Sequence, residues 1–165
     1  MGIKPQSPII IQLKMVKIKN KKFNAEMQIR AIELLNGSLH LPAAPNTAIA
    51  TFNFNIGIES KVDAPNKLVF VIVHVEIKND DYSLVLGALS VSCIFEIVNF
   101  DEVIKIEENG TLTIQQPLIE TLNSISISTT RGVMFSTFKG TFLHGAVLPI
   151  IDPKQFQTGS HKVGK

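Results

Sequence analysis

The sequence predicts an α+β fold in which an antiparallel sheet is followed by one long C-terminal helix. Three observations support this prediction: segments of alternating apolar residues follow one another, short polar turns separate them, and the apolar period then changes from two to nearly four. Short turns join antiparallel strands, because parallel strands need long crossovers. The chain has 165 residues, 45% of them apolar, which fits one domain. We assign residues 1–156 to this domain and expect residues 157–165 to be a disordered polar tail.

The composition excludes several classes of function. A formal net charge of +2 is much weaker than the concentrated basic patches of nucleic-acid-binding proteins, so we expect no nucleic-acid partner. The single cysteine excludes an intramolecular disulfide, and the start MGIKPQSPIII does not read as a signal peptide. We therefore expect a cytoplasmic protein. No apolar run approaches the roughly 20 residues of a membrane-spanning helix, so we expect no membrane insertion.

The first predicted strand covers residues 9–19, IIIQLKMVKIK. Its apolar alternation changes phase between Met15 and Val16, which indicates a bulge or bend near Met15. Lysines concentrate in and after this strand; they either protect an edge strand from pairing with other chains or mark an anionic partner. These lysines are Lys14, Lys17, Lys19, Lys21 and Lys22.

Residues 24–48 are interpreted as a long connection with some structure of its own. The run AEMQIRAIELL permits a short helix, and Asn36-Gly37 is a turn signal. Pro42 and Pro45 interrupt regular structure in the residues that follow.

Three more strands are predicted to follow one another. Residues 50–60 alternate cleanly, residues 69–77 alternate after the turn at residues 63–66, and residues 84–98 alternate after the turn at residues 79–81. The first two of these strands are expected to pair as a hairpin. Short connections between all three predict an antiparallel sheet.

A long helix is predicted from about Pro117 to Lys139, with Gly140 as its end. Proline is accepted in the first helical turn, and Leu118, Leu122 and Ile125 recur at helical spacing. The segment is rich in serine, threonine and glycine, which are weak helix formers, so packing must stabilise it.

Small residues recur every four positions along this predicted helix. They predict a face that another helix or a sheet approaches closely, such as an oligomer interface; the alternative is that the serines are solvated surface positions. The predicted interface residues are Ser124, Ser128, Gly132 and Ser136, and Gly140 continues the spacing.

No catalytic, metal-binding or cofactor-binding pattern is present in the sequence. The four histidines are dispersed, and no P-loop, dinucleotide-binding loop or nucleophile elbow occurs. Cys93 lies on the apolar side of its strand, where a small buried residue is expected rather than a nucleophile. We therefore predict no catalytic residue, no metal and no cofactor.

Two irregular segments carry more large apolar side chains than loops usually expose, namely residues 39–41 and residues 142–151. Such residues either pack on the core or mark a site that binds another protein.

One motif resembles a known family. Lys139-Gly140-Thr141-Phe142, followed by Leu148-Pro149, resembles the SecB protein-export chaperones, which typically have Arg-Gly-Thr-Phe followed by a similarly spaced Ala-Pro. Arg131 also falls close to a helix arginine common in that family. The resemblance spans roughly residues 9–151 and outside the motif rests on the order of elements.

The resemblance implies a two-layer α+β fold with a four-stranded antiparallel sheet in the order 1-4-3-2. It also implies an ATP-independent holdase that binds unfolded client polypeptides in apolar grooves and assembles as a homo-oligomer, a dimer of dimers. The predicted client-binding residues are Leu39, Leu41, Phe142, Leu143, Val147, Leu148, Ile150 and Ile151.

The sequence also departs from the family. SecB proteins that deliver clients to SecA use acidic residues near the end of the first strand, whereas residues 19–24 here read KNKKFN. We therefore do not expect delivery to SecA. The connection at residues 39–48 lacks the tryptophan often found there, and the final helix is reduced to a turn near residues 152–156. These departures motivate a second hypothesis, a SecB-like binding module for one partner, such as the antitoxin of a toxin–antitoxin pair.

Overall fold

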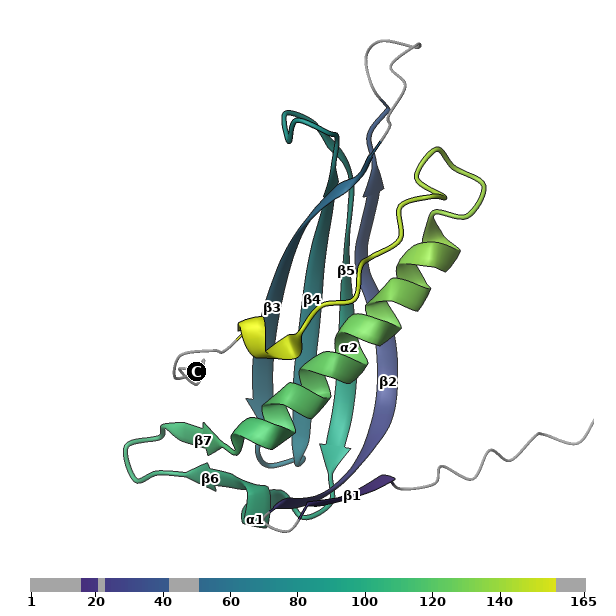
Figure 1. Cartoon of the computed structure of the whole chain (residues 1–165). Coiled ribbons are helices and arrows are strands. Elements are labelled where there is room, and N and C mark those ends of the chain that lie inside the picture. The colour runs from purple at the N-terminus through teal and green to yellow at the C-terminus, as the bar shows by residue number, and fades with distance from the viewer. Residues whose placement is uncertain (1–15, 21–22, 42–50, 157–165) are drawn as a thin grey trace, which may run out of the picture.

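The computed structural model describes residues 16–20, 23–41 and 51–156. In this part of the chain, five antiparallel strands form one sheet in the order β1-β2-β5-β4-β3, and a long helix, α2, lies across one face (Figure 1). The strands are β1 Val16–Asn20, β2 Phe23–Leu39, β3 Asn53–Asp63, β4 Leu68–Lys78 and β5 Val85–Ile97.

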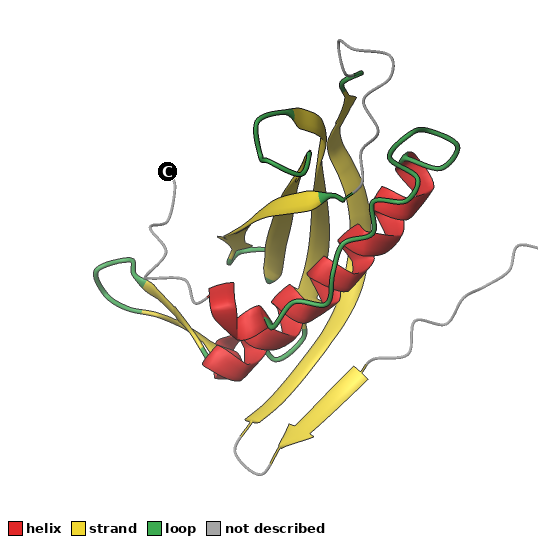
Figure 2. Ribbon diagram, turned by 45° about the horizontal axis from the view of Figure 1, so that its top comes forward, coloured by secondary structure: helices red, strands yellow, loops and turns green. Residues whose placement is uncertain are grey.

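The predicted fold class is confirmed. Counted from β2, the four long strands have the order 1-4-3-2, because β2 pairs with β5, β5 with β4, and β4 with β3. The helix and the segment that follows it lie on the same face of this sheet, which gives two layers (Figure 2). The fold is therefore α+β, with a SecB-like strand order.

The prediction for the first long strand was wrong. The strand beside β5 is β2 and not the predicted strand at residues 9–19, whose described residues 16–19 lie in the short edge strand β1. Residues 9–15, and Pro42 and Pro45 in the predicted connection, lie outside the described residues.

Residues 24–39 of the connection expected at residues 24–48, including its short helix and its turn, are part of strand β2. Pairing with β5 along this stretch outweighs the local helical tendency of the sequence. The register shifts between Ile29 and Ala31 and again between Leu34 and Asn36. Asn36-Gly37 therefore follows a bulge and does not form a hairpin turn.

The three later strands and their turns are confirmed. β3 and β4 form a hairpin that pairs Asn53 with Lys78 and Asp63 with Leu68. On β4 and β5, alternate residues such as Val73, Val91 and Phe95 have no exposed surface and form the centre of the core. The alternation in the sequence therefore identified the face that α2 covers.

A short helix and a small hairpin connect β5 to α2: α1 Phe100–Val103, β6 Ile104–Ile106 and β7 Leu112–Ile114. A turn at residues 107–110 joins β6 to β7. There the Gly110 amide donates to the Glu107 carbonyl oxygen over 2.8 Å. Gly110 adopts a φ of 80°, which favours glycine over residues with a side chain.

Helix α2 spans Gln116–Thr137 and carries Pro117 in its first turn, as predicted. Its sheet-facing residues, including Leu118, Leu122 and Met134, are buried against β4, β5 and β2. Burying such a side chain contributes about 1.5–3 kcal/mol, whereas serine or threonine costs at most about 0.7 kcal/mol of helix propensity per residue. Packing therefore stabilises a helix whose composition is unfavourable.

The chain then turns back and runs beside α2 toward β3 (Figure 1). Gly140, with a φ of 78°, follows the end of the helix as predicted. The returning segment, residues 141–152, is called the strap below. It ends in the one-turn 3-10 helix η1, Pro153–Phe156, the predicted single turn. The predicted disordered tail, residues 157–165, lies outside the described residues.

The start of the strap packs on β5 where the strand carries Gly87. A Cβ atom at this position would lie 2.5 Å from Leu143 Cδ1 and 3.0 Å from the Ser38 carbonyl oxygen. Leu143 is fully buried, so a shift of its side chain would disturb its core neighbours, and the Ser38 oxygen belongs to the backbone. We expect Gly87→Ala to lower the free energy of unfolding by about 1–3 kcal/mol, measured by denaturant titration.

Gly57 provides the matched control, because a Cβ atom there would meet only the Cβ of His74, at 4.0 Å. Gly57→Ala should leave stability unchanged or raise it slightly. Equal stability losses in the two variants would show that the strap does not pack closely on β5.

Candidate functional site

An open groove of about 510 Å³ lies between β3 and the strap. A volume of this size is within the range of about 300–1,000 Å³ that is typical of ligand sites. Most of the residues that line the groove are apolar, and three of them are phenylalanines. The lining residues are Phe52, Asn53, Phe54, Ile56, Pro149, Ile151, Gln155 and Phe156.

The first wall of the groove comes from the start of β3. Phe54 and Ile56 alternate with Asn53 and Asn55, so the apolar side chains share the face that carries the strap. The turn between β4 and β5 holds the start of this strand. Asp80 Oδ1 accepts hydrogen bonds from the amide and hydroxyl of Thr51, both at 2.9 Å, and Asn53 Nδ2 donates to the Asn79 carbonyl oxygen at 2.9 Å.

The second wall is the strap, which Arg131 of helix α2 holds in place. Arg131 Nε donates to the Leu148 carbonyl oxygen at 2.7 Å, and its Nη2 donates to the Pro149 carbonyl oxygen at 2.8 Å. Pro149 has no N–H and cannot donate to a neighbouring strand. The charged guanidinium group of Arg131 therefore provides hydrogen bonds to two backbone carbonyl oxygens of a segment that does not join the sheet.

The groove lies beside a free edge of the sheet. Strand β3 pairs with β4 only, and no other strand in the described part of the chain pairs with its outer edge. The N–H and C=O groups of that edge are available to an extended chain, which is one established mode of peptide recognition.

The structure places the predicted client-binding residues in four groups, three of which keep accessible surface. Ile151 lines the groove. Val147 and Ile150 are exposed on the strap, Ile150 to 95%, and Phe142 is half-buried near the start of the strap. Leu39 and Leu41 are exposed at the end of β2, where Leu39 pairs with Gly87.

For the other two predicted residues, Leu143 and Leu148, the expectation of an exposed client surface was wrong. Both are buried in the core, with 0% and 1% of their surface exposed. The strap alternates, so Ala146 and Leu148 point inward while Val147 points outward. These two leucines attach the strap to the domain and offer no surface to a client.

Sequence reasoning missed Phe52, Phe54, Ile56 and Phe156 as groove residues. The first three belong to the alternating strand predicted at residues 50–60, but an apolar strand face is a binding surface only where nothing covers it. The strap covers that face only in part, and the sequence has no local signal for this. Phe156 is the last residue of the turn predicted at residues 152–156, where a lone aromatic residue is uninformative.

The predicted small-residue face lies on the side of α2 that points away from the sheet. Ser124, Ser128, Gly132 and Ser136 are all exposed. A Cβ atom at Gly132 would have no neighbour within 4 Å. The face is therefore accessible to another molecule, and its role as an oligomer interface stays a prediction.

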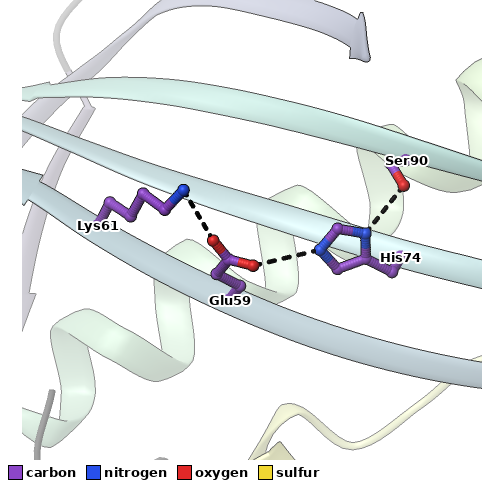
Figure 3. Close-up of polar contacts among 4 residues, drawn as sticks. All are labelled: Glu59, Lys61, His74 and Ser90. Atoms are coloured by element: carbon purple, nitrogen blue, oxygen red, sulfur yellow. Dashed lines mark hydrogen bonds and ion pairs between the residues drawn. The ribbon is translucent and has the colours of Figure 1, made fainter. Parts of the chain in front are cut away.

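A polar cluster on the opposite face of the sheet joins a serine, a histidine and a glutamate (Figure 3). Ser90 Oγ lies 2.8 Å from His74 Nδ1, and Glu59 Oε2 lies 3.5 Å from His74 Nε2. Lys61 Nζ lies 2.9 Å from Glu59 Oε1, and this hydrogen bond is the main cause of the lowered pKa of Glu59. His74 and Glu59 are each almost half exposed, and the cluster lies outside the groove. We interpret it as a cross-strand surface network, which resembles a catalytic triad only in its residue types.

Neither a metal cluster nor a membrane helix is found among the described residues. No group of three or more histidine, cysteine, aspartate or glutamate side chains is placed to hold a metal ion there. No helix in the same ranges is long and apolar enough to cross a membrane.

Comparisons with known proteins find a likeness among solved structures. No protein-family model and no curated protein sequence matches the chain. Among solved structures, the chain is similar to the SecB-like chaperone Rv1957 of Mycobacterium tuberculosis, solved in complex with a ChAD peptide from the Rv1956 HigA1 antitoxin. The TM-score is 0.52 at 16% sequence identity, and the match covers 76% of this chain and 89% of the other. This likeness shows a SecB-like fold.

The buried thiol of Cys93 yields a prediction about reactivity and pH. Burial raises the pKa of this thiol, so the folded protein keeps it protonated. We expect a thiol reagent to modify Cys93 far more slowly in the folded protein than in denaturant. Above the ordinary thiol pKa of about 8.5, only the unfolded chain ionises, so the free energy of unfolding should fall as pH rises.

Cys93→Ser provides the comparison, because serine does not ionise in this range. The difference in stability between the two proteins should change with pH only above about 8.5. Rapid modification of the folded protein would contradict a buried, protonated thiol.

Proposed function

We propose that this protein is an ATP-independent holdase that binds extended segments of unfolded polypeptides in the groove between β3 and the strap. The observation that carries the proposal is an open groove, lined mainly by apolar side chains, beside an edge of the sheet that no other described strand pairs with. Apolar side chains of a client would occupy the groove, and its backbone would pair with β3.

Energetics favour an extended polypeptide over a small ligand. Burying one apolar side chain contributes about 1.5–3 kcal/mol, whereas association costs at least about 4 kcal/mol. Several anchors on one chain are therefore needed for useful affinity. Only two polar side chains, those of Asn53 and Gln155, line the groove, which gives little basis for orienting a small polar substrate.

The structural neighbour supports a polypeptide ligand, because that chaperone was solved with a peptide of an antitoxin. It also supports a second candidate function, a dedicated binding module for one cognate partner such as an antitoxin. The two functions differ in breadth. A general holdase protects unrelated unfolded proteins at similar ratios, whereas a dedicated module binds one sequence and few others.

The proposal includes an assembly but excludes delivery to SecA. We propose that copies associate through the exposed small-residue face of α2, where backbones can approach closely. The dimer of dimers implied by the resemblance would need a second contact besides this one. Delivery to SecA is left out because residues 19–24 carry lysines where the family carries acidic residues.

The holdase proposal predicts that a charge in the groove weakens protection of a client. Ile151→Asp places a carboxylate in the apolar wall and should weaken binding about 10- to 100-fold, the equivalent of one buried side chain. The measurement is light scattering by a slow-folding protein during refolding, at increasing ratios of chaperone.

Ile106→Asp is the matched control, since Ile106 is 57% exposed on β6 and does not line the groove. This variant should protect the client as well as the wild-type protein does. Absence of protection by the wild-type protein at equimolar ratio would end the general holdase proposal. Equal losses of protection in both variants would show that the groove is not the client-binding site.

The assembly proposal predicts that a bulky charge on α2 blocks association. Gly132→Arg should reduce the mass measured by light scattering to that of the monomer, whereas Gly132→Ala should retain the oligomer and improve helix propensity by about 1 kcal/mol. A monomeric wild-type protein, or an unchanged mass for Gly132→Arg, would contradict it.

A further inference from the structure

The backbone amide of Ile150 on the strap has no hydrogen-bond partner in the described part of the chain. The amides of Ala146 and Gln155, on either side of it, donate to the Leu143 and Asp152 carbonyl oxygens, whereas the Ile150 N–H donates to no described residue. Ile150 is also 95% exposed. This N–H is therefore an uncommitted donor on an exposed residue of the strap.

The side chain of Ile150 is not the part of the residue that belongs to the groove. The sequence predicted Ile150 as a client-binding residue because its side chain is apolar. In the structure, however, the groove is lined by its neighbours Pro149 and Ile151 and not by Ile150 itself. Any role of Ile150 in client binding therefore falls to its backbone.

The hydrogen bond from Arg131 fixes the direction of the Ile150 amide. Arg131 Nη2 donates to the Pro149 carbonyl oxygen at 2.8 Å, so this C=O points toward the guanidinium group of helix α2. The described chain contains no cis peptide bond, and the C=O and N–H of a trans peptide unit point in opposite directions. The Ile150 N–H belongs to the same peptide unit as the Pro149 C=O. It therefore points away from Arg131.

The groove lies beside the strap on the side opposite Arg131. The strap runs from the end of α2 toward β3 (Figure 1), and Phe54 and Ile56 of β3 form the other wall of the groove. A polypeptide in the groove would thus lie between the unpaired edge of β3 and the Ile150 N–H.

Arg131 also makes this amide a better donor. A charged group donates a stronger hydrogen bond than a neutral one, and a hydrogen bond to the C=O of a peptide unit polarises the N–H of the same unit. The bond from Arg131 to Pro149 therefore both orients the Ile150 N–H and strengthens the hydrogen bond that it can donate.

We propose that the Ile150 N–H donates a hydrogen bond to a backbone carbonyl oxygen of the bound client. Successive peptide groups of an extended chain point to opposite sides, so pairing with β3 engages only alternate groups of the client. The others point across the groove toward the strap, where Ile150 provides a donor. The strap is then a second hydrogen-bonding wall, and Arg131 is its positioning residue.

This inference rests on the proposed function and names the chemical group that the groove recognises. Every residue of a client provides a backbone C=O, so the contact with Ile150 does not depend on the client's sequence. Recognition of this kind favours a general holdase over a module that is dedicated to one partner.

A proline substitution tests the donor. Ile150→Pro removes the N–H, whereas the matched control Ile150→Ala keeps the N–H and loses the same exposed side chain. The probe is a fluorescent synthetic peptide of leucine, glycine and lysine with an amidated C-terminus, whose backbone provides its only hydrogen-bond acceptors. We expect the Kd measured by anisotropy to be about three- to tenfold higher for Ile150→Pro than for Ile150→Ala, the loss of one hydrogen bond.

Amide exchange in the wild-type protein provides a second measurement, which also decides if Ile150→Pro fails to fold. Saturation with the same peptide should slow exchange of the Ile150 N–H at least about fivefold, measured by NMR. Asn109 is the control, because its N–H also donates to no described residue and lies in the turn between β6 and β7, outside the groove. Its exchange rate should not change.

The methyl signals of Ile56 and Ile151 in the groove separate failure of this inference from failure of the proposed function. Equal Kd values for folded Ile150→Pro and Ile150→Ala, or unchanged exchange of Ile150 while these signals shift, would overturn the inference and leave the groove as the client site. If the peptide shifted neither signal, the proposed function and the inference would both be rejected.

Discussion

The groove depends on the pair of hydrogen bonds that Arg131 donates to the carbonyl oxygens of Leu148 and Pro149. The strap has no strand partner among the described residues, and this charged fork connects its middle directly to helix α2. Hydrogen bonds to charged groups contribute about 1.5–3 kcal/mol each when well formed. Buried Leu143 and Leu148 anchor the strap on either side of exposed Val147. Together these contacts hold Pro149 and Ile151 opposite β3, and without them the groove would lose one wall.

The position of α2 explains why apolar surface remains at both margins of the sheet. The helix packs on β4 and β5 and reaches β2 near its C-terminal end, so it covers the centre of a five-stranded sheet (Figure 2). On the β3 side, the strap covers part of the remainder and leaves the groove. On the β2 side, Ile32 and Leu34 stay half exposed beside an open edge. One helix is too narrow to cover the whole face of this sheet, so apolar side chains stay partly exposed at both margins.

Much of the fold could be predicted from the sequence, because β3, β4, β5 and α2 carry strong periodic patterns bounded by turn residues. Strand β2 was missed because its two register shifts break the alternation and because the run AEMQIRAIELL at residues 25–35 has helical character. For the groove, Ile151 was found, but Leu143 and Leu148 were assigned to a surface that they help to build from within. Local sequence shows that a segment is apolar, whereas its exposure depends on contacts with Gly87 and Arg131 that are distant in sequence.

The central claim is that extended polypeptides bind between β3 and the strap. The most direct measurement is methyl NMR of the isoleucine residues during titration with a permanently unfolded client. The account predicts that the signals of Ile56 and Ile151 in the groove shift together and saturate, while Ile106 on β6 stays unchanged. Shifts confined to Ile32 on β2, with Ile56 and Ile151 unaffected, would contradict it.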